Sequence, residues 1–368
     1  MDEVLLAERL IGYDTSHRDG VGPCTDFIAG WLEARGATVE HVETGGRRCL
    51  LARTGAGPSR VILHGHLDVV PGRAEQFRPH VEGGRLVGRG AYDMKAALGA
   101  MMLAMADLVA HPPEAEVVLL VVPDEERSEP GINCTQILVD RGLRADFVVC
   151  GEPTDMLVGV QAKGVLMLAI TVNGVSAHGS TPWLGQNAVL RGVDLYRDIQ
   201  GLPFASESSA LFSRPSINLG RIEGGDAINK VPDLCRMQVD IRYLPGQRPE
   251  EVLRQVRSVD PRAEVEVILE RPPADVSPDH PYVIALLAAA GRHEPEAVSV
   301  GRDGASDAVA FLEVGVPAVE FGPRGAGHHG AHEYVEVDSL PRYRRALVEF
   351  ARLAGQCSRT AAPARVGG

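Results

Sequence analysis

The 368-residue chain is predicted to be an α/β protein in which a smaller α+β domain interrupts a larger one. In the first 160 residues, and again after about residue 275, continuous apolar runs alternate with helical patterns. This alternation is typical of a mainly parallel sheet covered by helices on both faces. Between these parts the pattern changes to β-α-β-β-α-β, which indicates a mostly antiparallel unit. The length also favours about two domains, at roughly 150 residues each.

In the larger domain, helical patterns cover residues 23–35, where Gly36 follows, then 95–109 and 132–141. The expected strands are the runs VILHGHLDVV, VVLLVV and ADFVVC, since their Val and Leu content suits strands buried on both faces. After the insertion come a helix over 281–291, the strand GVPAVEFGP and a helix over 340–354. The predicted boundaries of this domain are residues 1–161 and 275–357.

The inserted domain is predicted over residues 162–274. Its expected strands are GVLMLAITVNG, INLGRIEGG, DLCRMQVDIRYLPG and AEVEVILERPP. The expected helices are QNAVLRGVDLYRDI, after the first strand, and PEEVLRQVRSV, before the last. Residues 358–368 are small and polar, so we expect a flexible tail there.

Composition excludes several classes of protein. The chain is 45% hydrophobic and 23% charged, so it is not disordered as a whole. A net charge of −12 disfavours nucleic acid and anionic membranes as partners. No apolar run approaches the roughly 20 residues of a membrane span, and the acidic N-terminus has no signal-peptide pattern. Six scattered cysteines without a C-x-x-C pair indicate reduced thiols and a cytoplasmic protein. A serine hydrolase is disfavoured because no G-x-S-x-G elbow occurs.

Polar side chains cluster where the apolar strands end, and in open α/β sheets ligands bind off these carboxyl ends. Taken singly, each cluster is more typical of a solvated turn or a core histidine. Together, the carboxylates would repel one another unless cations were bound. The mixture of His, Asp and Glu therefore predicts two divalent metals, with Zn²⁺ or Co²⁺ suited to it. The residues are His64, His66, Asp68, Asp93, Asp124, Glu125, Glu126, Glu152, His328, His329 and His332.

Five of these segments resemble, in order, the motifs of a dinuclear metallohydrolase family. The family includes acetylornithine deacetylase, succinyl-diaminopimelate desuccinylase and carboxypeptidase G. The resemblance covers about residues 5–355, including the inserted domain. Its motifs are HGHLDVVP, GRGAYDMKAALGA, PDEE, GEPT and HHGAHEYVEV.

The resemblance implies that Asp93 bridges two metal ions. His66 and Glu152 would complete one site, and Glu126 and His329 the other. Zn²⁺ is the expected metal, with Co²⁺ and Mn²⁺ as alternatives. His329 is preferred because it lies four residues before the glutamate of the EYV segment, and His328 remains the alternative.

The other residues that the resemblance assigns have catalytic or binding roles. Asp68 would accept the second imidazole N–H of His66. Glu125 would be the general base, taking a proton from a metal-bridging water and passing it to the leaving amine. In the inserted domain, His178 would reach across a homodimer to stabilise the oxyanion. Asn229 and Arg242 would hold the substrate carboxylate.

The predicted function is hydrolysis of the amide bond of an N-acyl amino acid, as in a deacetylase or desuccinylase. The alternative is a di- or tripeptidase or a carboxypeptidase with the same machinery. A non-catalytic binding protein of the same fold is a remote third hypothesis, since every implied ligand and the base are present. Arg127 and Glu129, after the Glu-Glu pair, either shape the leaving-group pocket or face solvent.

Overall fold

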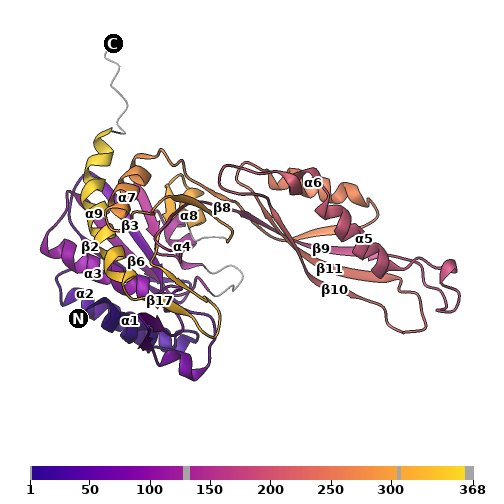
Figure 1. The fold of residues 1–368 in the computed structure, drawn as a ribbon, viewed down its shortest axis with the longest axis horizontal. Helices are drawn as coiled ribbons and strands as arrows, with labels where there is room; N and C mark the ends of the chain where they lie inside the picture. The colour runs from indigo at the N-terminus through magenta and orange to yellow at the C-terminus, as the bar shows by residue number, and fades with distance from the viewer. Residues whose placement is uncertain (1, 127–132, 305–307, 361–368) are drawn as a thin grey trace, which may run out of the picture. The chain divides into compact units, whose positions relative to one another are not determined.

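The computed structural model describes residues 2–126, 133–304 and 308–360 (Figure 1). Contacts divide the chain into two compact units. The first unit comprises Met1–Val160, Val276–Val300 and Ala310–Gly368. The second comprises Gln161–Asp275 and Gly301–Val309. The last of these segments differs from the sequence-based boundaries, which left it with the larger domain. The predicted tail lies mostly outside the described residues.

The predicted α/β class is confirmed by a large central sheet with a parallel middle. In this sheet β3 runs parallel to both β6 and β7, and β15 runs parallel to β7. The strands at the edges pair antiparallel. In spatial order the strands are β1 (Thr38–Thr44), β2 (Arg47–Thr54), β6 (Ala115–Val122), β3 (Ser59–His66), β7 (Phe147–Cys150), β15 (Ala318–Glu320), β8 (Val158–Ala162) and β13 (Ala274–Asp275), with β14 (Ser299–Arg302) also paired to β8.

Helices cover this sheet, and the most buried of them is α3 (Lys95–Ala110). It is apolar on all sides and packs between α1 and α9, as expected of a helix buried in a core. The other helices outside the insertion are α1 (Glu3–Ile11), α2 (Arg18–Glu33), α4 (Cys134–Asp140), α7 (Pro281–Gly291), α8 (Ala308–Leu312) and α9 (Ser339–Thr360).

The predicted start of the second helix is wrong by five residues, because α2 begins at Arg18 and contains Pro23. The prediction placed proline in the first turn, where its missing N–H has no cost. In the structure the extra turn packs tightly against the preceding segment. A Cβ on Gly20 would lie 1.8 Å from the carbonyl oxygen of Asp14. The extra turn is therefore accompanied by a close local contact, which the pattern of apolar residues does not signal.

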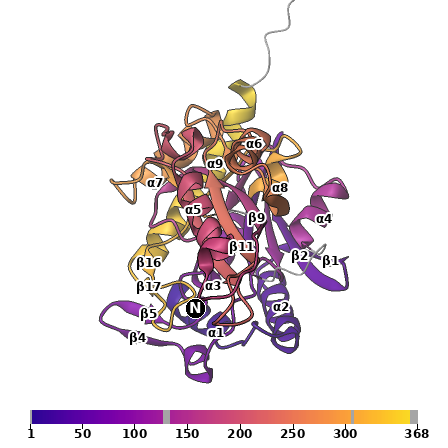
Figure 2. The ribbon, with the colours of Figure 1, turned by 90° about the vertical axis from the view of Figure 1, so that its right-hand side faces the viewer.

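A small antiparallel sheet joins two segments that are far apart in sequence (Figure 2). The main-chain N–H of Gly88 donates to the carbonyl oxygen of Glu333 at 3.0 Å, which continues the pairing past the strands. The sheet therefore aligns the Gly-rich stretch before Asp93 with the His-rich loop. Its strands, in order, are β16 (Gly325–Ala326), β17 (Tyr334–Glu336), β5 (Arg85–Val87) and β4 (His80–Glu82).

The inserted unit has the predicted β-α-β-β-α-β order, and its antiparallel sheet runs β10-β11-β9-β12. Both helices pack on one face of this sheet (Figure 1), where Leu195 and Val252 join the buried side chains of the strands. The elements are β9 (Gly164–Asn173), α5 (Ala188–Gln200), β10 (Ser216–Gly224), β11 (Leu234–Tyr243), α6 (Pro249–Val259) and β12 (Glu264–Arg271).

Candidate metal centre and active site

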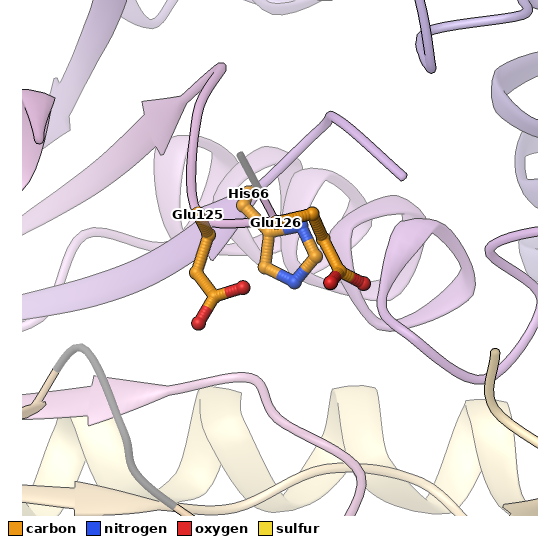
Figure 3. A group of neighbouring side chains, drawn as sticks. All are labelled: His66, Glu125 and Glu126. Atoms are coloured by element: carbon orange, nitrogen blue, oxygen red, sulfur yellow. The ribbon is translucent and has the colours of Figure 1, made fainter. Parts of the chain in front are cut away.

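Three neighbouring parallel strands bring the predicted ligands to one edge of the large sheet. His66 is the last residue of β3. Glu125 and Glu126 follow the end of β6, and Glu152 lies two residues after the end of β7. Because β6, β3 and β7 are adjacent and parallel, their carboxyl ends meet at this edge. Figure 3 shows His66 between the side chains of Glu125 and Glu126.

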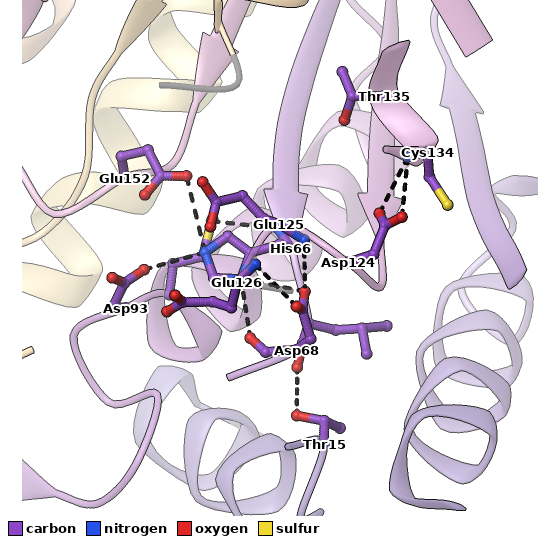
Figure 4. Close-up of polar contacts among 12 residues, drawn as sticks. Thr15, His66, Asp68, Asp93, Asp124, Glu125, Glu126, Cys134, Thr135 and Glu152 are labelled. Atoms are coloured by element: carbon purple, nitrogen blue, oxygen red, sulfur yellow. Dashed lines mark hydrogen bonds and ion pairs between the residues drawn. The ribbon is translucent and has the colours of Figure 1, made fainter. Parts of the chain in front are cut away.

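Asp93 stands between two histidines. His66 Nε2 lies 3.1 Å from Asp93 Oδ1, and His329 Nε2 lies 3.4 Å from Asp93 Oδ2. On the far sides, Glu152 Oε1 is 3.9 Å from His66 Nε2, and Glu126 Oε1 is 2.9 Å from His329 Nε2. One carboxylate is therefore shared by two ligand groups: His66, Asp93 and Glu152, which Figure 4 shows, and Asp93, Glu126 and His329. A third group overlaps them: His66, Glu125 and Glu126.

The charge balance of these groups fits bound cations. Burial, with the charges of Asp93 and Glu125, raises the pKa of Glu152 well above its ordinary value, although His66 opposes this. Burial also raises the pKa of Glu126. The hydrogen bond to Asp93 raises the pKa of His329 to about 9. In the absence of metal, protons thus offset the carboxylate charges.

A buried carboxylate oxygen is a second indication that this site suits a bound cation. Glu152 Oε1 is buried and accepts no hydrogen bond within the part of the chain that the structure describes. A buried carboxylate oxygen without a donor is costly, and a divalent cation would satisfy it. Oxygen and imidazole donors in this mixture suit Zn²⁺.

Asp68 makes contacts that differ from those the resemblance implied. The Nδ1 atom of His66 lies 3.0 Å from the main-chain oxygen of Asp68, while the carboxylate Oδ1 is 3.7 Å away. The carboxylate instead accepts the main-chain N–H groups of Glu125 and Glu126, at 3.1 and 3.0 Å. Asp68 therefore holds the imidazole through its backbone and the Glu-Glu turn through its side chain (Figure 4).

The remaining predicted residues lie in the inserted unit. His178 and Asn229 are adjacent, because the N–H of Gly179 donates to the carbonyl oxygen of Asn229 at 2.7 Å. The exposed His178 ring contacts Ser180, with 2.7 Å between Nδ1 and Oγ. Arg242, on β11, forms a two-point ion pair with Asp240, at 2.9 Å from Nε and 3.0 Å from Nη2.

Two buried residues near the ligands have no assigned role in the sequence analysis. Arg89 and Glu333 form an ion pair beside Asp93, with 2.7 Å between Nη1 and Oε2. The available signal was an arginine between two glycines in the stretch that leads to Asp93. His328 contacts the rings of Tyr92 and His329. Arg127 and Glu129 lie outside the described residues.

This fold and these ligand groups define a metal-dependent hydrolase, and sequence comparison assigns its family. Residues 62–353 match the model of peptidase family M20/M25/M40, and the chain belongs to this family. It is therefore a metal-dependent amidohydrolase or metallopeptidase, as predicted. The chain is 30% identical to acetylornithine deacetylase of Myxococcus xanthus over 93% of its length and 94% of that protein. It is 29% identical to succinyl-diaminopimelate desuccinylase of Acidovorax ebreus, covering 96% and 99%.

Solved structures support the fold. Aminopeptidase PepT from Bacillus cereus superposes with a TM-score of 0.80 at 20% identity, covering 96% of this chain and 98% of that one. A metallo-carboxypeptidase of the M20 family from Sulfolobus solfataricus gives 0.76 at 18%, covering 97% and 100%. A Bacillus subtilis protein described as a dinuclear metal-binding peptidase of this family gives 0.71 at 15%, covering 96% and 98%. Within the described residues, no helix is long and apolar enough to span a membrane.

Proposed function

We propose that the chain removes the acyl group from an N-acyl amino acid, in the manner of a deacetylase or desuccinylase. The observation that carries this proposal is the sharing of Asp93 between two ligand groups. Such an arrangement suits two cations acting on one amide. The relatives with matching length are named as a deacetylase and desuccinylases. The cleaved bond would yield a carboxylate and a free amino acid.

His66, Asp93 and Glu152 would hold one cation, and Asp93, Glu126 and His329 the other, with Zn²⁺ as the expected metal. When bound, the two cations supply Lewis acidity that polarises the amide carbonyl and makes a nearby water more acidic. The chain's own contribution is to place neutral imidazoles and ionised carboxylates around them. Both histidines must lose their extra protons first, so metal binding releases protons.

Glu125 is our candidate for the general base and acid. It belongs to neither of the two groups that share Asp93, so this proposal leaves its carboxylate without a cation to hold and gives it the proton-transfer role. It would take a proton from the attacking water and give it to the departing amine. The main-chain bond from Glu125 to Asp68 fixes the start of its side chain, which favours a constant direction of attack.

The inserted unit would bind the substrate and a second copy of the chain. Arg242 and Asn229 would hold the substrate carboxylate, and His178 would act in the partner's active site by donating to the oxyanion. Apolar side chains next to His178 support a homodimer: Trp183 is 76% exposed, and Leu184 and Ile228 are also exposed. Large exposed apolar side chains close together mark interaction surfaces.

The compartment is part of the same proposal. The six cysteines are buried thiols, which fit a reducing environment. We therefore place the protein in the cytoplasm, in amino-acid metabolism.

The deciding experiment measures release of primary amine by chain loaded with Zn²⁺ or Co²⁺. Its substrates are N-acetyl, N-succinyl and longer N-acyl amino acids, together with dipeptides and tripeptides. Glu125→Gln serves as the blank. Turnover of one acyl class, absent in the blank, is the expected result. Turnover of peptides alone would replace the deacylase by a peptidase. A chain that binds two cations yet cleaves nothing in the panel would contradict the proposed substrate class.

A further inference from the structure

Arg89 and Glu333 form a buried ion pair whose contribution to stability does not account for its placement. Their side chains are 4% and 1% exposed, and Nη1 lies 2.7 Å from Oε2. Removing two charges from water is expensive, and apolar replacements of buried pairs are often equally stable. A pair of this kind is better explained by the geometry that it imposes on its neighbours.

Glu333 holds the segment that carries the shared ligand. Its Oε1 accepts the main-chain N–H of Tyr92 and the main-chain N–H of Asp93, both at 3.0 Å. A charged acceptor with two main-chain donors makes strong, directional hydrogen bonds. The position of the Asp93 backbone is therefore set by the Glu333 carboxylate, which Arg89 in turn orients.

Arg89 holds the segment that carries the second histidine. Its Nη2 donates to the carbonyl oxygen of His329 at 3.3 Å. His329 has φ 61°, a left-handed conformation that costs a non-glycine residue about 1–3 kcal/mol and persists only where the surroundings impose it. Gln76 Nε2 donates to the next carbonyl oxygen, that of Gly330, at 3.1 Å. Two side chains thus fix this turn from the same side.

The ion pair therefore touches the two ligand groups unequally. In the group of Asp93, Glu126 and His329 it holds the main chain of two members. In the group of His66, Asp93 and Glu152 it holds one. His66 and Glu152 are fixed separately, by the strand ends of β3 and β7.

We propose that Arg89 and Glu333 are positioning residues that set the spacing of Asp93 and His329, and thereby the affinity of the second cation. This inference depends on the metal centre proposed above. The pair connects two neighbouring strands of the small sheet, since Arg89 follows β5 and Glu333 precedes β17. The spacing of the ligands is thus determined by residues 244 positions apart.

The test is a titration of metal-free protein with Co²⁺ in the absence of substrate. Binding is measured by calorimetry and by the visible absorption of bound cobalt. The unaltered chain should bind two ions. Arg89→Lys keeps the charge, but one ammonium group lacks the planar fork that serves both Glu333 and His329. We expect one of the two ions, the one held by Asp93, Glu126 and His329, to lose affinity by about 10–100-fold, the usual effect of removing a partner that orients a ligand. The other ion should change much less.

Arg344→Lys is the matched control, because Arg344 forms an ion pair as well, with Asp107 at 2.6 and 2.7 Å, and none of its polar contacts among the described residues is with a candidate ligand. It should bind both ions normally. Glu333→Gln is the second variant: it retains an oxygen for the two N–H groups but not the ion pair, and it should show the same selective loss.

Two results would overturn the inference while leaving the metal centre in place. One is normal affinity for both ions in Arg89→Lys and Glu333→Gln. The other is an equal loss for both ions that follows the fall in melting temperature of the metal-free protein, which would make the pair merely structural. If the unaltered chain does not bind two ions, the proposed metal centre fails, and this inference fails with it.

Discussion

In the first unit the candidate ligands are held by buried main-chain contacts, whereas in the inserted unit the candidate substrate-binding residues lie on exposed or partly exposed elements. The side chains of His66, Glu126 and Asp93 are 0%, 7% and 12% exposed, and among the assigned ligands only that of His329, at 51%, departs from this pattern. His178 and Asn229 are exposed, and Arg242 is partly exposed. The first set is already organised for cations. If the proposed function holds, the second set would gain its final surroundings when substrate or a second chain binds.

This difference has a physical cause. Ligands at the ends of parallel strands are attached to a rigid core, because the main-chain groups of these strands are paired in the sheet. His178 lies five residues after the end of β9, and its exposed ring contacts Ser180. Ordering such side chains on binding therefore costs free energy and lowers the affinity. Substitutions in the first unit should alter proton transfer or metal content. Those in the second should alter substrate binding, or turnover that depends on a second chain.

The largest effect is expected for Glu125→Gln. The variant should bind both cations and lose turnover by about 10²–10⁴-fold, as is typical when a general base or acid is removed. Metal content and amine release, measured on the same preparation, check this. Glu40→Gln, on the surface, should behave as the unaltered chain. Activity within about tenfold of normal would remove Glu125 from proton transfer.

His178→Ala should lower turnover by about 10²-fold, the scale for one oxyanion donor, with normal metal content. If His178 acts in the partner's site, mixing this variant with Glu125→Gln should restore activity. Each mixed dimer would have one intact site, so equal mixing should give about a quarter of normal activity. Mixed dimers that stay inactive would place His178 in its own chain's site and weaken the contrast between the units.

Much of the first unit could be predicted because its signals are local and repeated. Continuous Val and Leu runs indicated buried parallel strands, and the polar residues after them pointed to one edge of the sheet. The helix at 95–109 was predicted within one residue, since α3 is Lys95–Ala110. The family resemblance carried the choice of ligands, which periodicity alone left open.

The contacts that depend on the main chain could not be predicted. The carboxylate of Asp68 accepts N–H groups of Glu125 and Glu126, and no side-chain pattern signals such bonds. The ion pair of Arg89 with Glu333 depends on a sheet whose strands β16 and β17 have two and three residues. Strands this short show no alternation, so their pairing appears only in three dimensions.

Arg242→Lys should raise KM about tenfold and leave kcat nearly unchanged, since a charged hydrogen bond of the fork is worth about 1.5–3 kcal/mol. Asp240 occupies the Nε and Nη2 edge of Arg242, which orients the rest of the fork for a carboxylate. The measurement compares a substrate with a free carboxylate and the same substrate as a carboxamide. An equal effect on both would show that Arg242 does not bind the carboxylate.

The smallest effect concerns a partly buried ring in the first unit, far along the sheet from the ligand edge. His280 stacks on Phe147 and Tyr282, and burial lowers its pKa below the ordinary value of 6.5. In the unfolded chain His280 therefore takes up a proton near pH 6.5, whereas in the folded chain it does so only at lower pH. The free energy of unfolding consequently decreases as the pH falls below 6.5.

Urea unfolding of the metal-free protein at several pH values checks this, with His280→Gln as the variant that cannot titrate. The unaltered chain should lose more stability than the variant between pH 7 and pH 5. In the inserted unit, Asp226→Asn removes a largely solvent-exposed pair with Lys230, in which the two side chains are 67% and 33% exposed. Because solvent screens such a pair, that variant should follow the unaltered chain at every pH. If the pH dependence of stability were lost in Asp226→Asn and kept in His280→Gln, the contrast between the two units would be reversed.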